Sequence, residues 1–356
     1  MARVLVLQTG MVGDVVMSVP ALKTVRNRFP EAAITLVAGP WASAVLAGEH
    51  FVTDIVTLRP PWQGPRRLRH AVTFVAEALR LRRRRYDIGV DLRGDPRSLL
   101  FLYLTGAAQR VSYAWHGAPM GEYLLTQVVP GPAPDAHLVD RYLTVASALG
   151  GRAASRLPEI AIAPHERQAA ATWREAALSR QGATQLVGIH PGAANALRLW
   201  KTERFAALIG QLMAMPGVGV AVFVGPSDAL IAQELADRLG ATVPLERLGL
   251  REFIVRASAL DCFVGVDSAP GHIAAAQGVP VVSLFGPALP AFAGPIGRAV
   301  RVVEEGVFEC RPCTQEKCVH PEASCMDAIG VEVVLAAVAE TLGKGPAARG
   351  HRVERR

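Results

Sequence analysis

The sequence predicts an α/β protein built from two doubly wound domains, and three observations lead to this prediction. Short apolar strands alternate with amphipathic helices along the chain, as parallel sheets covered by helices on both faces require. The alternation stops at a proline-containing segment, 158–164, and then begins again. The chain has 356 residues, 51% of them apolar and 19% charged, which is enough for two domains with buried cores.

The first series predicts a domain over residues 1–163 and the second a domain over 164–343, with a disordered basic tail at 344–356. After the first strand, a helix either begins near Ser18, with Pro20 in its first turn, or is kinked at Pro20. The expected strands cover 3–7, 33–37, 54–58, 87–92, 109–112, 186–190, 218–224, 261–266 and 279–284. The further helices cover 68–84, 96–104, 140–149, 165–180, 202–213, 228–239, 250–258, 270–277 and 331–342, and 114–137 is expected to be irregular.

The net charge of +7 is concentrated in an arginine cluster, 80–85, and in the tail. The cluster is either a solvated helix end or a contact for anionic lipid at the inner membrane face. Aromatic residues make up only 6% and no recognition motif accompanies the charge, so nucleic-acid binding is excluded. The sequence shows no signal peptide and no apolar run of about 20 residues, which predicts a cytoplasmic location.

Ligands of such sheets bind beyond the carboxyl ends of the strands, and the first such loop runs from Gln8 to Asp14. It is neither a dinucleotide-binding G-x-G-x-x-G loop nor a phosphate-binding P-loop, and no acidic residue follows the second strand, so NAD is disfavoured. Gly10 and Gly13 allow a ligand to approach the backbone closely. Asp14 is either a helix N-cap or a general base for a bound hydroxyl group.

The second loop follows the first strand of the second domain. It begins at His190 and Gly192, and it carries Arg198 and Lys201, whose cationic groups are suited to phosphate oxygens. The alternative is an exposed basic loop in which Trp200 anchors the packing. Thr202 is expected to cap the next helix.

The third loop joins a buried strand to a helix rich in small residues. The backbone amides at the start of this helix can bind an anion, and Ser268 and His272 add side-chain donors, so a leaving diphosphate could be held without a metal ion. The alternative is a tight turn capped by Asp267.

These loops resemble those of glycosyltransferase family 9, the ADP-heptose:lipopolysaccharide heptosyltransferases. The resemblance covers residues 3–340 and is carried by Gly13-Asp-Val-Val, Pro20-Ala-Leu, His190-Pro-Gly-Ala, Trp200 and, above all, by 265–280 with Phe285-Gly-Pro. It implies the GT-B fold: an N-terminal acceptor domain and a C-terminal nucleotide-sugar domain that face a central cleft.

The resemblance also implies an inverting, metal-independent transfer of a heptose or related sugar from an ADP-sugar to a saccharide acceptor such as the lipopolysaccharide inner core, with no further cofactor. Asp14 matches the family's proposed catalytic base. The residues expected to bind the donor and its diphosphate are Gly13, His190, Gly192, Arg198, Lys201, Asp267, Ser268, Ala269, Gly271 and His272.

Two residues depart from the family pattern. Arg198 stands where the family usually has Lys, and Ala269 stands where the founding heptosyltransferases have Gly, which leaves the donor sugar open. The alternatives are another nucleotide sugar, a small-molecule acceptor, or a protein that binds a nucleotide sugar without catalysis.

Four of the five cysteines form a C-x2-C-x4-C-x6-C segment: Cys310, Cys313, Cys318 and Cys325. Four neighbouring thiolates can hold zinc or an iron–sulfur cluster, but this spacing fits no standard zinc pattern. The sequence therefore predicts no metal and leaves these four residues as the alternative. Cys262 is expected in the core.

Overall fold

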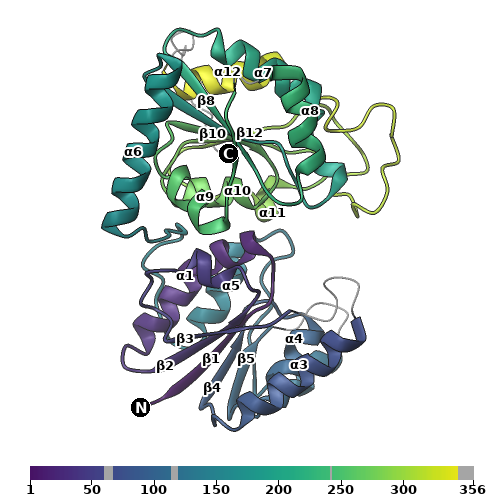
Figure 1. Ribbon diagram of the computed structural model, residues 1–356. Helices are drawn as coiled ribbons and strands as arrows, with labels where there is room; N and C mark the ends of the chain where they lie inside the picture. The colour runs from purple at the N-terminus through teal and green to yellow at the C-terminus, as the bar shows by residue number, and fades with distance from the viewer. Residues whose placement is uncertain (60–66, 114–118, 241–242, 344–356) are drawn as a thin grey trace. The chain divides into compact units, whose positions relative to one another are not determined.

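The computed structural model describes residues 1–59, 67–113, 119–240 and 243–343, and the chain divides into two compact units (Figure 1). The first unit comprises Met1–Ile162 with Ala291–Ala293, and the second comprises Ala163–Pro290 and the chain from Gly294 onward. Each unit contains a six-stranded, wholly parallel sheet. The predicted fold class, two Rossmann-like doubly wound domains, is confirmed. The expected tail at 344–356 lies outside the described residues.

The sheet of the first unit has the strand order β3-β2-β1-β4-β5-β6. Its central strand is apolar on both faces because helices cover both sides: Val6 lies between Leu36 and Val90 of the neighbouring strands, and all three side chains are fully buried. The strands are β1 (Arg3–Gln8), β2 (Ala33–Ala38), β3 (Asp54–Thr57), β4 (Ile88–Asp91), β5 (Gln109–Ser112) and β6 (Gln127–Val128).

The helices of the first unit form two layers. The first layer contains α1 and α5, which pack against each other, and the second contains α3 and α4, which lie side by side (Figure 1). The helix after β1 begins at Val12, so the expected start near Ser18 is wrong, and Pro20 lies inside the helix. The helices are α1 (Val12–Arg28), α2 (Ala42–Val45), α3 (Arg67–Arg82), α4 (Pro96–Leu104) and α5 (Leu138–Ser147), with a 3-10 helix, η1 (Pro119–Leu124).

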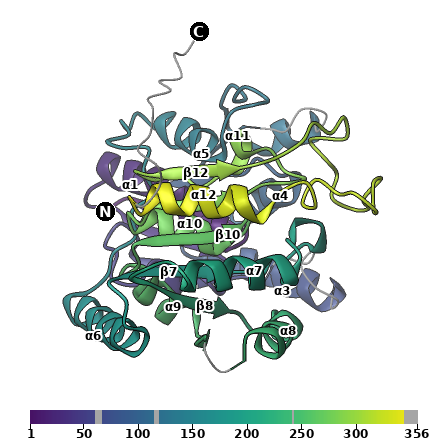
Figure 2. The same cartoon turned by 90° about the horizontal axis from the view of Figure 1, so that it is seen from above.

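The second unit repeats this topology in the order β12-β11-β10-β7-β8-β9. Helices α7 and α12 pack together over one face of the sheet (Figure 2), whereas α9 contacts α6 and α10. The strands are β7 (Gln185–His190), β8 (Val218–Val224), β9 (Leu245–Arg247), β10 (Cys262–Val266), β11 (Val281–Leu284) and β12 (Val300–Val303). The helices are α6 (Pro164–Gln181), η2 (Ala196–Arg198), α7 (Thr202–Met213), α8 (Ala229–Leu239), α9 (Leu250–Ala257), α10 (Ala269–Ala276), α11 (Pro290–Ala293) and α12 (Val331–Thr341).

Several local expectations are corrected by the structure. Lys201, not Thr202, occupies the N-cap of α7, and Ser268, not Asp267, occupies the N-cap of α10. The expected irregular stretch 114–137 contains η1 and β6, and β9 and β12 were not predicted. These strands have two to four residues and include polar side chains, so they carry too little apolar periodicity to be recognised.

Across the described ranges, no helix combines the length and the apolar character that crossing a membrane requires.

Candidate active site

Both sheets have a switch point where the chain reverses the direction in which it adds strands. In the first sheet this point lies between β1 and β4, and in the second it lies between β7 and β10. Loops that leave neighbouring strands on opposite sides open a crevice at such a point. The segments that follow these strands contain Asp14, in the first turn of α1, in the first unit, and Arg198, in η2, with Asp267 in the second.

Asp14 is the third residue of α1, and its carboxylate accepts two direct hydrogen bonds. The backbone N–H of Met11 donates to Oδ2 at 2.7 Å, and the hydroxyl of Tyr142, on α5, donates to Oδ1 at 2.9 Å. Tyr142 is buried, and burial together with the charge of Asp14 raises its pKa well above the ordinary value, so the phenol stays protonated. The carboxylate thus accepts a backbone N–H at the start of α1 and is fixed in one orientation. The N-cap of α1 is Met11, so the alternative that Asp14 is the N-cap is wrong.

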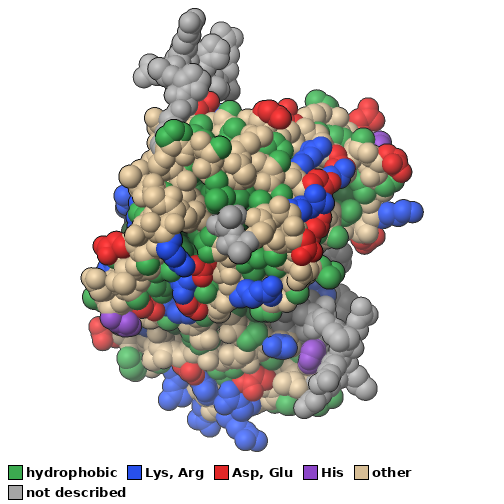
Figure 3. All heavy atoms as spheres, turned by 45° about the horizontal axis from the view of Figure 1, so that its top comes forward, with side chains coloured by type: hydrophobic (Ala, Val, Ile, Leu, Met, Phe, Trp, Pro, Cys, Tyr) green, Lys and Arg blue, Asp and Glu red, His purple; other side chains and the backbone are tan. Residues whose placement is uncertain are grey.

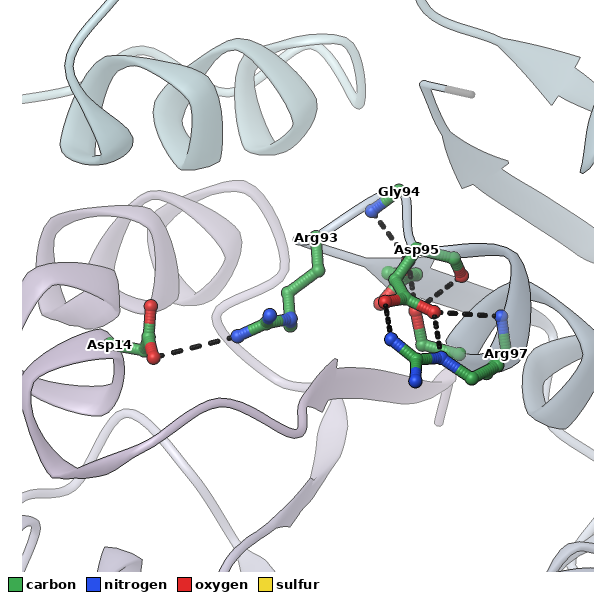
Figure 4. Close-up of polar contacts among 7 residues, drawn as sticks. Asp14, Arg93, Gly94, Asp95 and Arg97 are labelled. Carbon is green, nitrogen blue, oxygen red and sulfur yellow. Dashed lines mark hydrogen bonds and ion pairs between the residues drawn. The ribbon is translucent and has the colours of Figure 1, made fainter. Parts of the chain in front are cut away.

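Arg93 approaches Asp14 from the loop after β4 (Figure 4), with 3.5 Å between a guanidinium nitrogen and Oδ2. Burial by itself lowers the pKa of Arg93, but Asp14, Tyr142, Asp91 and Asp95 more than offset this effect and raise it. Gly10 lies beneath this pair: a Cβ there would lie 2.4 Å from the guanidinium and 2.5 Å from Asp14. The two loops therefore meet only because position 10 has no side chain.

Asp91 fixes the loop that carries Arg93. It is completely buried at the end of β4 and accepts hydrogen bonds from the N–H of Gly94 at 2.8 Å and from Ser98 Oγ at 2.9 Å. Burial raises the pKa of Asp91 to about 6, although these two donors oppose the shift. Next to it, Asp95 caps α4 and pairs with Arg97 (Figure 4).

In the second unit, Arg198 joins the loop after β7 to the loop after β10. Its guanidinium lies 3.0 Å from Asp267 Oδ2, and its Nε donates to Gln315 Oε1 at 2.5 Å. Burial raises the pKa of Asp267, and the charge of Arg198 opposes the shift. The side chain of Arg198 is about one-third exposed, whereas that of Asp267 is nearly buried. The group of this pair that a ligand can reach is therefore the guanidinium cation.

The other residues of the second loop mostly have internal partners. Lys201 pairs with Asp327 at 2.8 Å, and Trp200 is buried and donates to the carbonyl of Ile329. His190 is buried, with Nδ1 2.9 Å from the carbonyl of Phe223, and burial lowers its pKa. A Cβ at Gly192 would lie 2.3 Å from Asp228 Oδ1, so this glycine is required by the protein's own packing.

The third loop places five predicted donor residues at the start of α10. Ser268 is the N-cap but makes no side-chain capping bond, and its hydroxyl donates to the carbonyl of Val266 at 3.3 Å. Gly271 and His272 are buried in the first turn, behind Ala269 and Pro270. Pro270 has no N–H and the N–H of Gly271 donates to the carbonyl of Ser268 at 3.2 Å, so an anion at this helix start would meet the N–H groups of Ser268 and Ala269.

The four-cysteine segment lines a cavity of about 230 Å³ in the second unit, together with His320 and residues of η2. All four are free thiols, and within the described ranges no three His, Cys, Asp or Glu side chains are arranged to hold a metal ion. Gln315 belongs to this segment and contacts Arg198 and Asn195, so the cavity wall adjoins the second loop. Cys262 is fully buried in the core, as expected.

Three residues near these loops were not predicted: Arg93, Tyr142 and Gln315. Arg93 follows β4 at the switch point, and a survey of every strand end in the sequence would have found it. Tyr142 lies within a helix and Gln315 in an irregular segment, and neither position gives a signal in the sequence.

Comparison with known proteins relates this fold and these loops to one family. The model of glycosyltransferase family 9 (heptosyltransferase) matches residues 76–323, which is more than half of the chain. The chain is 27% identical to lipopolysaccharide heptosyltransferase 2 of Escherichia coli K12 over 318 residues, 85% of this chain and 87% of the relative. It is 25% identical to heptosyltransferase 3 of the same organism over 284 residues, 77% of this chain and 79% of the relative.

Solved structures of the same family have the same fold. The glycosyltransferase family 9 structure from Veillonella parvula superposes with a TM-score of 0.78 at 21% identity, covering 97% of this chain and 98% of that one. The E. coli ADP-heptose heptosyltransferase II gives a TM-score of 0.74 at 22% identity, covering 97% and 99%. The predicted GT-B fold is therefore confirmed. By the match over most of its length, the chain belongs to glycosyltransferase family 9, and it is a glycosyltransferase.

Proposed function

We propose that this enzyme transfers a heptose, or a closely related sugar, from an ADP-sugar to a saccharide acceptor such as the lipopolysaccharide inner core. The relatives named above are lipopolysaccharide heptosyltransferases, and a solved heptosyltransferase of the same fold, WaaC of E. coli, holds ADP-2-deoxy-2-fluoro heptose. The observation that carries the proposal is the orientation of Asp14 by Met11 and Tyr142 at the switch point of the first sheet.

Asp14 is the general base of this proposal. Its carboxylate takes the proton from the acceptor hydroxyl as that oxygen attacks the anomeric carbon of the donor sugar. The bond from the anomeric carbon to the β-phosphate oxygen breaks on the opposite side, so one displacement inverts the configuration and releases ADP. Tyr142 and Met11 hold the carboxylate still, which limits the entropy lost on reaching the reactive geometry.

The second unit supplies the donor site. The amides at the start of α10 and the guanidinium of Arg198 bind the diphosphate and stabilise the negative charge that grows on the leaving ADP. Lys201 lies on the same loop, half-exposed beside Asp327, and adds a second cation. Of the other residues expected to bind the donor, His190, Gly192, Asp267, Ser268, Ala269, Gly271 and His272 belong to the segments after β7 and β10, whereas Gly13 lies in α1 of the first unit. This arrangement needs no metal ion and no cofactor besides the donor.

The first test is a calorimetric titration of the purified protein with ADP, UDP and GDP, with and without EDTA, followed by transfer assays with the matching sugars. Selective binding of ADP that EDTA leaves unchanged is the expected result. A preference for UDP or GDP would keep the loops but overturn the heptose donor, and metal-dependent binding would overturn the metal-independent mechanism.

A lipid-linked acceptor also requires the enzyme to work at the inner membrane face, as a peripheral protein of the cytoplasm. The arginine cluster at the end of α3 supports this part of the proposal. Arg80 and Arg84 pair with Glu77 and Asp54, but Arg82, Arg83 and Arg85 have no ion-pair partner among the residues the structure describes.

A further inference from the structure

Helix α3 is apolar on the face that it should present to water. Its inner face contributes Phe74, Ala78 and Leu81 to the core of the first unit, as an amphipathic helix does. On the opposite face, however, Val72, Val75 and Leu79 are exposed by 64%, 43% and 47%. Their spacing of three and four residues places them in one stripe along the helix.

The neighbouring helix carries further exposed apolar side chains. The rings of Phe74 on α3 and Phe101 on α4 lie 4.7 Å apart, so the two helices are side by side (Figure 1). Helix α4 exposes Leu100 by 45% and Tyr103 by 47%. We call the exposed side chains of both helices the α3–α4 surface: Val72, Val75, Leu79, Leu100 and Tyr103.

Positive charge adjoins the surface. Arg82, the last residue of α3, lies three residues beyond Leu79, and Arg83 follows it in the turn; both are exposed. Lys and Arg side chains gather at the lower end of the molecule in Figure 3, the end at which Figure 1 shows the C-terminal turn of α3. An apolar stripe that ends in arginines is the composition of helices that lie in a membrane interface.

We propose that the α3–α4 surface docks on a bilayer that contains anionic phospholipid. The apolar side chains enter the boundary between headgroups and acyl chains, Tyr103 lies at headgroup level, and Arg82 and Arg83 bind phosphate groups. The inference rests on the proposed function only for its purpose, which is to bring the enzyme to a lipid-linked acceptor. Docking itself follows from the surface.

A second copy of the chain fits this surface less well. Arg82 and Arg83 would gain no anionic partner from the α3–α4 surface of a second copy, because that surface carries no carboxylate. A stable protein interface also takes roughly 20–30 residues from each side, many more than this surface offers.

The test is sedimentation of the full chain with phosphatidylcholine vesicles that contain phosphatidylglycerol, compared with phosphatidylcholine vesicles alone, with no donor or acceptor present. Wild type should bind the anionic vesicles. Replacing Val75→Ser and Leu79→Ser together should weaken binding about tenfold, since two apolar side chains no longer leave water. Replacing Arg82→Gln and Arg83→Gln together should weaken it about 30-fold on anionic vesicles only.

Matched controls lie in the second unit. Leu230, on α8, is 87% exposed, and Leu230→Ser should leave vesicle binding unchanged. Replacing Arg180→Gln and Arg238→Gln together removes the same total charge at two other exposed helix ends. This pair should weaken binding to anionic vesicles no more than threefold. All variants keep residues 344–356, so any contribution of the tail cancels.

Three outcomes would overturn the inference: no binding of wild type to anionic vesicles, binding that neither pair of substitutions weakens, or a dimer in solution that V75S/L79S dissociates. Transfer to a soluble acceptor separates this inference from the proposed function, because the docking variants should keep that activity in full. If transfer fails in wild type while vesicle binding depends on both pairs, the function is wrong and the docking surface remains.

Discussion

The switch points of the two sheets use the same strand order but hold their carboxylates in different ways. Asp14 in the first unit accepts hydrogen bonds from the neutral groups of Met11 and Tyr142, while Arg93 stays at 3.5 Å. Asp267 in the second unit contacts the cation Arg198 directly, at 3.0 Å. The side chain of Asp14 is 19% exposed and that of Asp267 only 7%. The start of α1 therefore exposes a carboxylate and the segment after β7 a guanidinium, as the proposed base and the proposed diphosphate site require.

The largest effect is expected from removing the accessible carboxylate. Asp14→Asn keeps an acceptor for Met11 but no longer takes a proton, so kcat should fall by about 100- to 10,000-fold, the usual contribution of a general base. Affinity for ADP should change less than twofold. Steady-state kinetics and calorimetry measure the two quantities. Asp140→Asn, which breaks an exposed pair with Arg156 in the same unit, is the control; full activity of D14N would refute the assignment.

The second effect is on stability and comes from Asp91, the buried carboxyl group that fixes the loop of Arg93. The pKa of Asp91 is raised to about 6, so between about pH 4 and pH 6 the folded state binds more protons than the unfolded state. The free energy of unfolding should therefore decrease as pH rises through this window, by at most about 3 kcal/mol. Urea denaturation across the window should show a smaller decrease for Asp91→Asn than for wild type, whereas Asp95→Asn should retain it. An unchanged slope in D91N would contradict this account.

The next largest effect is expected from removing Arg198, the exposed cation of the second unit. Arg198→Gln removes a charged donor, so the Kd for ADP should rise roughly 10- to 100-fold. Arg174→Gln is matched to it, because Arg174 pairs with Asp261 at 2.7 Å in the same unit, and it should leave the Kd unchanged. The two variants should be compared at equal folded fraction. If both substitutions weaken ADP binding equally, Arg198 does not bind the diphosphate.

The smallest effect is expected from removing one of the two hydrogen bonds that hold Asp14. Tyr142→Phe removes one hydrogen bond from Asp14, so kcat should fall about tenfold while ADP affinity stays the same. Tyr123→Phe, at a position 85% exposed, should have no effect. A loss of ADP affinity in Y142F would mean that Tyr142 supports the fold in general.

The sequence predicted most of the fold because the inner strands contain runs of buried apolar residues, such as Val4 to Leu7 in β1. Strands such as 218–224 and helices such as 96–104 were placed at their true bounds. The loops at the switch points were also predicted, since glycines and charged residues follow those strands. The partners of each side chain were not, because Tyr142 approaches Asp14 across 128 residues and Gln315 approaches Arg198 across 117. Such pairings follow from tertiary packing, which no local pattern records.

Four residues of the segment after β7 are held by contacts within the protein. Gly192 fits against Asp228, Asn195 and Arg198 are bonded to Gln315, and Trp200 is fixed to Ile329. Immobilising a flexible side chain upon binding costs about 0.5–1.5 kcal/mol, and here that entropy is lost during folding instead. The nucleotide of the proposed reaction would meet side chains that are already in place, so its association should need no slow ordering step and should show little heat-capacity change from this loop.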